Sequence, residues 1–244
     1  MQFTEADRHQ AGPLDEPAET ISTPASLLAR HRCWSCLENI PDLVALPATW
    51  QEAWGHEFAA FRTLCLQSTA SFATAVRCPD CGCLHSVIHR HDHTGAIGIR
   101  RCDPPDCPDI ILTLPDITLL EVNLARFGRG LCVAFGFDSK TAEFPLPHTA
   151  QFGAWSARAV PAVLTIQRDQ LVFRRVAADL AARLARPFML FAPTSAHLDA
   201  EVRAAFETHG TAFFTLESSV VLEADGTLQA LNMPVMPTRW SPDP

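Results

Sequence analysis

Two closely spaced cysteines carry the strongest chemical signal in the sequence. Cys78 and Cys81 form the run Cys-Pro-Asp-Cys, and Gly82 follows directly. Zinc prefers four tetrahedral thiolate or imidazole ligands, and a Cys-x-x-Cys turn supplies two of them. A glycine after the second cysteine lets the backbone turn back, so that its amides point at the sulfur atoms. We therefore expect a structural zinc ion with Cys78 and Cys81 among its ligands.

The remaining ligands are open between two other cysteine pairs. Cys33 and Cys36 share the two-residue spacing but lie far upstream, with an expected helix in between. Cys102 and Cys107 lie closer to Cys81, but four residues separate them. Either pair completes a four-thiolate site, and the pair left over is available for a second ion.

The stretch CWSCLENIPDLVAL followed by CPDCG resembles the two knuckles of bacterial zinc-ribbon proteins, written CWxC…CPxCG. The resemblance covers only residues 33–46 and 78–82. It implies that Cys33 and Cys36 complete the zinc site. It also implies a ribbon that docks nucleic acid or a protein partner.

Charge limits the nucleic-acid interpretation. The formal net charge is −8, and Lys140 is the single lysine, so general polyanion binding over the whole surface is excluded. Arg90, Arg100 and Arg101 lie in or beside the hairpin expected after Cys83. These three arginines are the expected nucleic-acid contacts.

A second group of polar residues follows three expected strands, 161–166, 188–192 and 212–216. Asp169, Ser195, His197 and Glu217 come just after those strands. Ligands of parallel sheets bind at the carboxyl ends of the strands, so these four residues are candidate ligand contacts. Asp169 and Ser195 also suit helix N-caps, which is the competing interpretation.

The elements that position these residues indicate a mixed fold, α/β in its second half and α+β overall. Apolar residues at helical spacing, from Trp50 to Cys65, predict a packed helical face. Thr118 and Glu121 fit a capping box that opens a further helix, and Asp225-Gly226 fits a hairpin turn. The expected organisation is a disordered tail (1–22), a helical zinc-ribbon module (23–112), a mainly parallel α/β domain (113–232) and a loose tail (233–244).

Several features of the composition bear on where in the cell the protein is located. It has no apolar run of transmembrane length, its N-terminus is polar, and its nine cysteines are an odd number. We therefore expect a cytoplasmic protein without membrane contact. The single lysine and the absence of tyrosine are typical of a GC-rich bacterial genome.

We expect a non-enzymatic recognition or regulatory protein. Two alternatives remain. One is a metal-dependent hydrolase or nuclease using Asp169, His197 and Glu217, and the other is a nucleotide-sensing domain. The element order resembles the restriction-endonuclease-like core, but the strand PAVLTI and the residues after it lack the acidic residue and lysine of that family.

Overall fold

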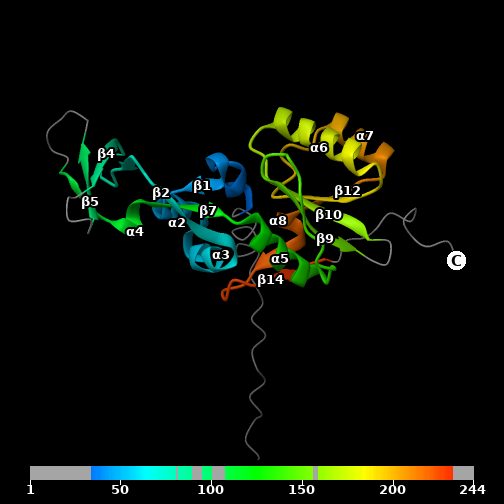
Figure 1. Ribbon diagram of the computed structural model, residues 1–244, viewed down its shortest axis with the longest axis horizontal. Coiled ribbons are helices and arrows are strands. Elements are labelled where there is room, and N and C mark those ends of the chain that lie inside the picture. The colour runs from blue at the N-terminus through cyan, green and yellow to red at the C-terminus, as the bar shows by residue number, and fades with distance from the viewer. Residues whose placement is uncertain (1–33, 81, 90–94, 101–107, 156–158, 233–244) are drawn as a thin grey trace, which may run out of the picture.

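The computed structural model describes residues 34–80, 82–89, 95–100, 108–155 and 159–232. Both expected tails, 1–22 and 233–244, lie outside these residues. Three regions follow one another across the molecule: a small antiparallel sheet at one end, a helical centre, and an α/β unit at the other end (Figure 1). Within the described ranges, no helix is long and apolar enough to cross a membrane.

The α/β unit is built on one five-stranded sheet in the order β12-β11-β10-β9-β8. The three strands β10, β11 and β12 are parallel, and β9 and β8 are added antiparallel. Helices α6 and α7 make the two crossovers between the parallel strands, as expected for β-α-β connections. The bounds are β8 Ala142–Glu143, β9 Thr149–Trp155, β10 Val160–Thr165, α6 Gln170–Leu184, β11 Met189–Ala192, α7 Ala200–His209 and β12 Ala212–Thr215. The predicted mixed α and β fold class is confirmed.

Both faces of this sheet are covered, which explains its continuous apolar strands. On β11, Met189 and Phe191 pack toward α5 (Leu124–Phe135), while Leu190 and Ala192 pack toward α6 and α7. All four β11 residues are at most 3% exposed. The unit is therefore a three-layer arrangement with one helical layer on each side.

Aromatic packing holds the helical centre together. The helical centre comprises five short segments: η1 (Cys36–Glu38), η2 (Pro41–Leu43), α2 (Pro47–Trp54), η3 (Gly55–Glu57) and α3 (Phe58–Cys65). The rings of Trp54 and Phe61 stack with centroids 3.7 Å apart, and Trp34 meets Trp54 edge-on. Trp50, Trp54, Phe61 and Cys65 are buried, so the predicted packed face is confirmed.

The expected helix start at Thr118 is wrong. Thr118–Val122 is strand β7, which pairs with β1 (Val44–Ala45) and β2 (Leu66–Phe72). The helix begins only at Leu124, where the side chain of Asn123 accepts a hydrogen bond from the Arg126 amide. Pairing on both edges satisfies the backbone of β7, which a local capping pattern does not reveal.

A true capping box lies a few residues earlier. The Thr113 amide donates to the Asp116 carboxylate at 2.8 Å and opens the short helix α4 (Leu114–Ile117). The expected domain boundary falls between residues 112 and 113. β7 lies after this boundary, whereas its two partner strands, β1 and β2, lie before the boundary. The two expected units therefore share one sheet.

The small antiparallel sheet is a four-stranded meander in the order β3-β4-β5-β6. Its strands are β3 (Ala75–Arg77), β4 (Leu84–His89), β5 (Gly95–Arg100) and β6 (Ile110–Thr113). One face packs on a small cluster around Val76, Ala96 and Ile117. The opposite face carries aliphatic side chains that no element of the described chain covers.

The last hairpin is formed as predicted. β13 (Val220–Leu222) follows the short helix α8 (Leu216–Ser219) and pairs with β14 (Leu228–Ala230). Gly226 has a φ of +85°, and the Asp225 carboxylate accepts the Thr227 amide at 2.9 Å. A left-handed residue in the turn requires glycine, so the Asp-Gly signal is confirmed here.

Candidate ligand-binding cleft

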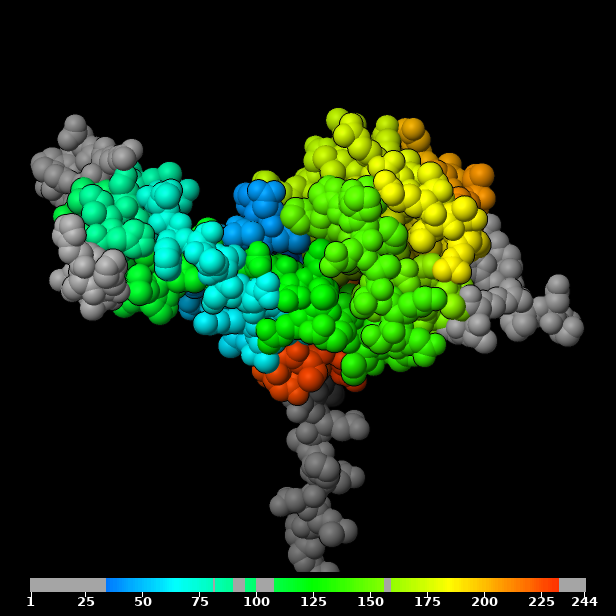
Figure 2. Space-filling view, in the orientation of Figure 1, coloured from blue at the N-terminus to red at the C-terminus, as the bar shows by residue number. Residues whose placement is uncertain are grey.

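A hollow of about 480 Å³ lies where the carboxyl ends of β10, β11 and β12 meet the N-terminal η1 segment. Figure 2 shows this segment, in blue, in contact with the surface of the α/β unit. The lining residues come from four places in the sequence: Ser35, Glu38, Asn39, Arg168, Thr194, Ser195, Ala196, His197 and Glu217. A volume of this size accommodates a small molecule.

The ends of the strands determine which side chains reach the cleft. After β11 the chain passes Pro193 and turns at Thr194, whose hydroxyl accepts the Ala196 amide at 3.0 Å. This turn positions Ser195 and His197 at the sheet edge. The Glu217 amide donates to the Pro193 carbonyl at 3.2 Å, which connects the residues after β12 to the same edge.

Glu38 closes the cleft from the N-terminal side and is only 8% exposed. Its Oε1 accepts the Thr194 amide at 3.1 Å, and its Oε2 accepts the Thr194 hydroxyl at 2.7 Å. One carboxylate thus binds both donors of a residue 156 positions away. Two such bonds orient the carboxylate firmly and join η1 to the end of β11.

The electrostatics of Glu38 reflect its surroundings. Burial is the main cause that raises the pKa of its carboxyl group above the usual value. The two Thr194 hydrogen bonds and the charge of His197 lower the pKa, and the charge of Glu217 raises it. The carboxylates of Glu38 and Glu217 therefore repel each other across the cleft.

Among the described residues, His197 has a ring nitrogen without a hydrogen-bond partner. Its Nε2 is buried, and no hydrogen-bond partner for it exists among the described residues. Its ring lies 6.2 Å from the ring of Phe173 on α6. Buried imidazole nitrogens are normally hydrogen-bonded, so this atom is a candidate contact for a water molecule or a ligand.

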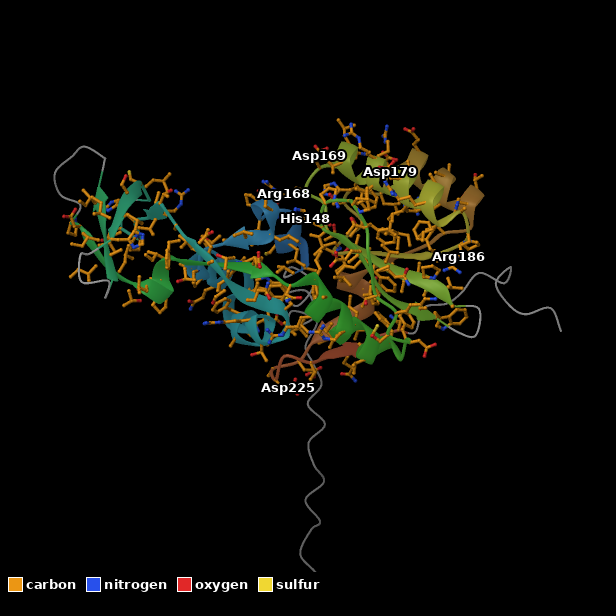
Figure 3. All side chains as sticks on the ribbon, in the orientation of Figure 1. His148, Arg168, Asp169, Asp179, Arg186 and Asp225 are labelled. Atoms are coloured by element: carbon orange, nitrogen blue, oxygen red, sulfur yellow. The ribbon has the colours of Figure 1, made fainter. Side chains whose placement is uncertain are left out.

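Three of the four expected ligand contacts, Ser195, His197 and Glu217, line the cleft. Asp169 does not. Its carboxylate caps α6 by accepting the amides of Leu171 and Val172 at 2.8 and 3.0 Å. Figure 3 shows Arg168 toward the N-terminal segment and Asp169 at the start of α6. The trio Asp169, His197 and Glu217 expected for a hydrolase therefore does not line one cleft.

Sequence reasoning missed the N-terminal wall of the cleft. Ser35, Glu38 and Asn39 lie in the stretch that resembles a zinc knuckle, a pattern that gives no sign of a ligand cleft, and only the fold brings them to the strand ends. Arg168 lies directly before Asp169. It could have been predicted in the same way, because it also follows the end of the expected strand 161–166.

The expected metal ligands fall into two groups. Cys33, Cys81, Cys102 and Cys107 lie outside the described residues. Cys36 lies in η1, where its thiol donates to the Ala53 carbonyl at 3.1 Å and burial raises its pKa. Cys78 is buried and borders a hollow lined by the first residues of α2. Cys36 and Cys78 therefore lie near opposite ends of α2.

The three arginines expected to contact nucleic acid are described only in part. Arg90 and Arg101 lie outside the described residues. Arg100 is the last residue of β5, where its backbone pairs with His85. His85 is fully buried, and its Nδ1 lies 3.2 Å from the Gly98 carbonyl.

No protein-family model matches the chain, and neither a curated protein nor a solved structure is detectably similar to it. Among the described residues, no three Cys, His, Asp or Glu side chains are grouped so that they could hold a metal ion. The identification with bacterial zinc-ribbon proteins is therefore wrong. The physical reason lies in the first expected knuckle, because Cys36 is in a 3-10 helix bonded to α2 rather than on a turn between strands.

Proposed function

We propose that the protein is a non-enzymatic recognition or regulatory protein that binds a small polar ligand in the cleft at the ends of β10, β11 and β12. The observation that carries the proposal is the convergence of polar side chains from three strand ends and from η1 on one hollow. The buried Nε2 of His197, which has no partner within the described ranges, supports it. Catalysis is not favoured, because Asp169 caps a helix instead of joining His197 and Glu217.

A thermal-shift screen of the full chain tests this proposal. The probes are nucleoside monophosphates, NAD, amino acids, dicarboxylates and amines, each at millimolar concentration. A ligand that binds only the folded state raises the midpoint of unfolding by mass action, by about 2.7 kcal/mol of stability at 100 times its Kd. We expect at least one probe to stabilise the protein and His197→Ala to abolish that shift.

The matched control is Asp169→Asn, which changes a polar residue beside the cleft without touching its lining. It is expected to keep the ligand-dependent shift, because the asparagine side-chain oxygen can still cap α6 and the cleft lining is unchanged. Equal shifts in the parent and in His197→Ala would remove the cleft as the binding site. Stabilisation by a nucleotide alone would select the nucleotide-sensing form of the proposal.

A structural zinc ion at the β3–β4 turn is a second proposal, supported by the backbone of that turn. The Cys78 amide donates to the Cys83 carbonyl at 2.8 Å, and the Gly82 amide donates to the Cys78 carbonyl at 2.9 Å. Gly82 has a φ of +70°, as a tight turn around a thiolate requires. In this proposal Cys78 and Cys81 supply two ligands, and Cys102 and Cys107, beyond the end of β5, supply the others.

Elemental analysis of the purified protein tests the zinc proposal. One zinc per chain that is lost in Cys102→Ser and retained in Cys33→Ser is the expected result. Cys65→Ser serves as the control, because Cys65 is a buried thiol on α3. A chain without zinc would contradict the proposal, and loss in Cys33→Ser alone would move the site to Cys33 and Cys36.

Docking of nucleic acid or a protein through the β3–β6 region, in the cytoplasm, completes the proposed role. For nucleic acid, the expected contacts are Arg90, Arg100 and Arg101. We expect salt-sensitive binding that weakens when all three are changed to alanine. Absence of binding at low salt would end the nucleic-acid form of this role. The odd number of cysteines in the chain argues against a framework of disulfide bonds and so supports a cytoplasmic location.

A further inference from the structure

Exposed aliphatic side chains gather on the open face of the β3–β6 meander. Nine large apolar side chains of the described residues are exposed, and four of them lie on this face: Leu84, Ile88, Ile99 and Ile111. Their exposed fractions are 59%, 52%, 38% and 81%. Ile97, which is partly exposed, lies among them on β5. We call these five residues the aliphatic face.

The strand register makes the aliphatic face continuous. Ile88 on β4 lies opposite Ile97 on β5, and Ile97 lies opposite Ile111 on β6. Side chains directly opposite each other on neighbouring strands are about 5 Å apart, so these three form an unbroken row. The alternate residues, such as Ala96 and Leu112, point to the other side of the sheet and pack in the small core cluster.

The charges on this side of the sheet suit a second copy of the chain. Strand alternation and register place five further described residues there, none of them acidic: Ala75, Arg77, Ser86, Gly95 and Thr113. Arg77, on the edge strand β3, donates to the Gly82 carbonyl at 2.7 Å. A chain of net charge −8 repels its own copies in general. At this face, however, two copies meet through apolar side chains without opposing carboxylates.

The size of the aliphatic face predicts a weak dimer. The five side chains expose on the order of 400 Å² per copy, within the range of the largest patches on monomers, which are often functional. Two such faces bury less than the roughly 1,200–2,000 Å² of stable complexes, so we expect a reversible dimer. Figure 1 shows the meander at the end of the molecule away from α6 and α7, where a second copy can approach it.

We propose that two copies of the chain associate through their aliphatic faces, with the two meanders stacked around a two-fold axis. The same surface then serves on both copies, as two-fold symmetry requires. Stacked sheets lie about 10 Å apart with interdigitated side chains. Pairing along the β6 edge would leave Leu84 and Ile88 in water, whereas stacking covers the whole face. The inference names the protein partner for the docking role of the β3–β6 region and so rests on that part of the proposed function.

Analytical ultracentrifugation of the full chain, from low to several hundred micromolar in reducing buffer, tests the inference. We expect a monomer–dimer equilibrium with a Kd of tens of micromolar or weaker. Ile111→Lys is expected to weaken it at least tenfold, because two ammonium groups would enter an apolar contact. Lysine is common on exposed edge strands, so the fold is retained. Ile88→Thr keeps a β-branched residue and is expected to weaken association several-fold.

Val133→Lys is the matched control. Val133 lies on α5 and is 82% exposed, close to the 81% of Ile111, and the substitution adds the same charge. It corrects for the general effect of a less negative chain on association. We expect it to leave the dimer unchanged. The inference is overturned if Val133→Lys weakens association as much as Ile111→Lys, or if neither Ile111→Lys nor Ile88→Thr weakens it.

Hydroxyl-radical labelling of Leu84, Ile88 and Ile111 identifies what covers the face. We expect labelling in dilute solution and protection at high concentration. Protection in a monomer at every dilution would show that the same chain covers the face, and would overturn the inference. A monomer with a labelled face at every concentration would also overturn it. The nucleic-acid form of docking and the cleft would then still stand on their own tests, the arginine variants and the thermal-shift screen.

Discussion

The two main sheets of this protein differ in how many of their faces are covered. The β8–β12 sheet has α5 on one face and α6 and α7 on the other, and its inner strand β11 is buried throughout. The β3–β6 meander is covered on one face only. On its open face Ile88, Ile97 and Ile111 pair side by side across three strands, and Ile111 is 81% exposed.

The difference indicates a division of tasks. Apolar area removed from water stabilises the fold by about 25 cal/mol per Å², so the doubly covered sheet contributes most of the stability. A rigid sheet also holds the strand ends that shape the cleft. The meander has less buried area per residue. Its stability therefore depends more on whatever binds at its turns. The following predictions test this comparison, beginning with the largest effect.

Phe191→Ala is expected to cause the largest loss. Phe191 is fully buried in β11, and its ring contacts Phe135, Phe152 and Phe214. Removing a buried aromatic ring costs about 3–5 kcal/mol. Ile111→Ala on the open face is expected to cost about 0.5 kcal/mol or less. Urea unfolding of both variants measures the contrast, and similar losses would contradict the division between the sheets.

Gly128→Ala tests the close contact between α5 and the sheet. A methyl group at position 128 would lie 2.5 Å from Cβ of Phe152 on β9, so the helix must move away. We expect a loss of about 1–3 kcal/mol in the free energy of unfolding. Gly130→Ala is the control. The closest atom to its methyl group would be the end of the Leu64 side chain at 2.8 Å, which can shift, and alanine favours the helix by about 1 kcal/mol.

Asp169→Ala separates helix capping from ligand binding. The substitution removes the acceptor for the Leu171 and Val172 amides and is expected to cost about 1 kcal/mol. Asp179→Ala, within the same helix, is expected to be close to neutral because it caps nothing. Chemical denaturation gives both values. Loss of cleft binding in Asp169→Ala without unfolding would assign Asp169 to the ligand after all.

Glu38→Gln is expected to change the pH dependence of stability, the smallest of these effects. The pKa of Glu38 is raised mainly by burial, so the folded state keeps its proton where the unfolded chain has released it. The stability contributed by the neutral form is therefore present below the usual carboxyl pKa and is lost as pH rises through the folded-state pKa.

The measurement is the free energy of unfolding of the parent and of Glu38→Gln between about pH 4 and pH 7, around the usual glutamate value. We expect the parent to lose stability relative to the variant as pH rises. A constant difference across this range would show that Glu38 has the same pKa in the folded and unfolded chain. Glu143→Gln, at an exposed site, is the control and is expected to track the parent.

Local patterns predicted part of the molecule well. The strands around 161–166, 188–192 and 212–216 and the Asp225-Gly226 hairpin are recognisable because continuous apolar runs and turn residues need little context. The Thr118 helix was predicted wrongly because its capping pattern matched by sequence alone, whereas pairing with β1 and β2 determines that segment. The zinc-ribbon identification failed at Cys36 for a related reason, since spacing does not distinguish a helix from a knuckle.

The sequence by itself determined the fold class, the apolar core of the α/β unit and three residues of the cleft, because strand ends follow directly from the strands. Only the tertiary structure decided that Glu38 completes the cleft, and that the Asp169 carboxylate caps α6 instead of lining the cleft. The reason is physical: a buried carboxylate is identified by the donors that surround it, and those of Glu38 come from Thr194, 156 residues along the chain.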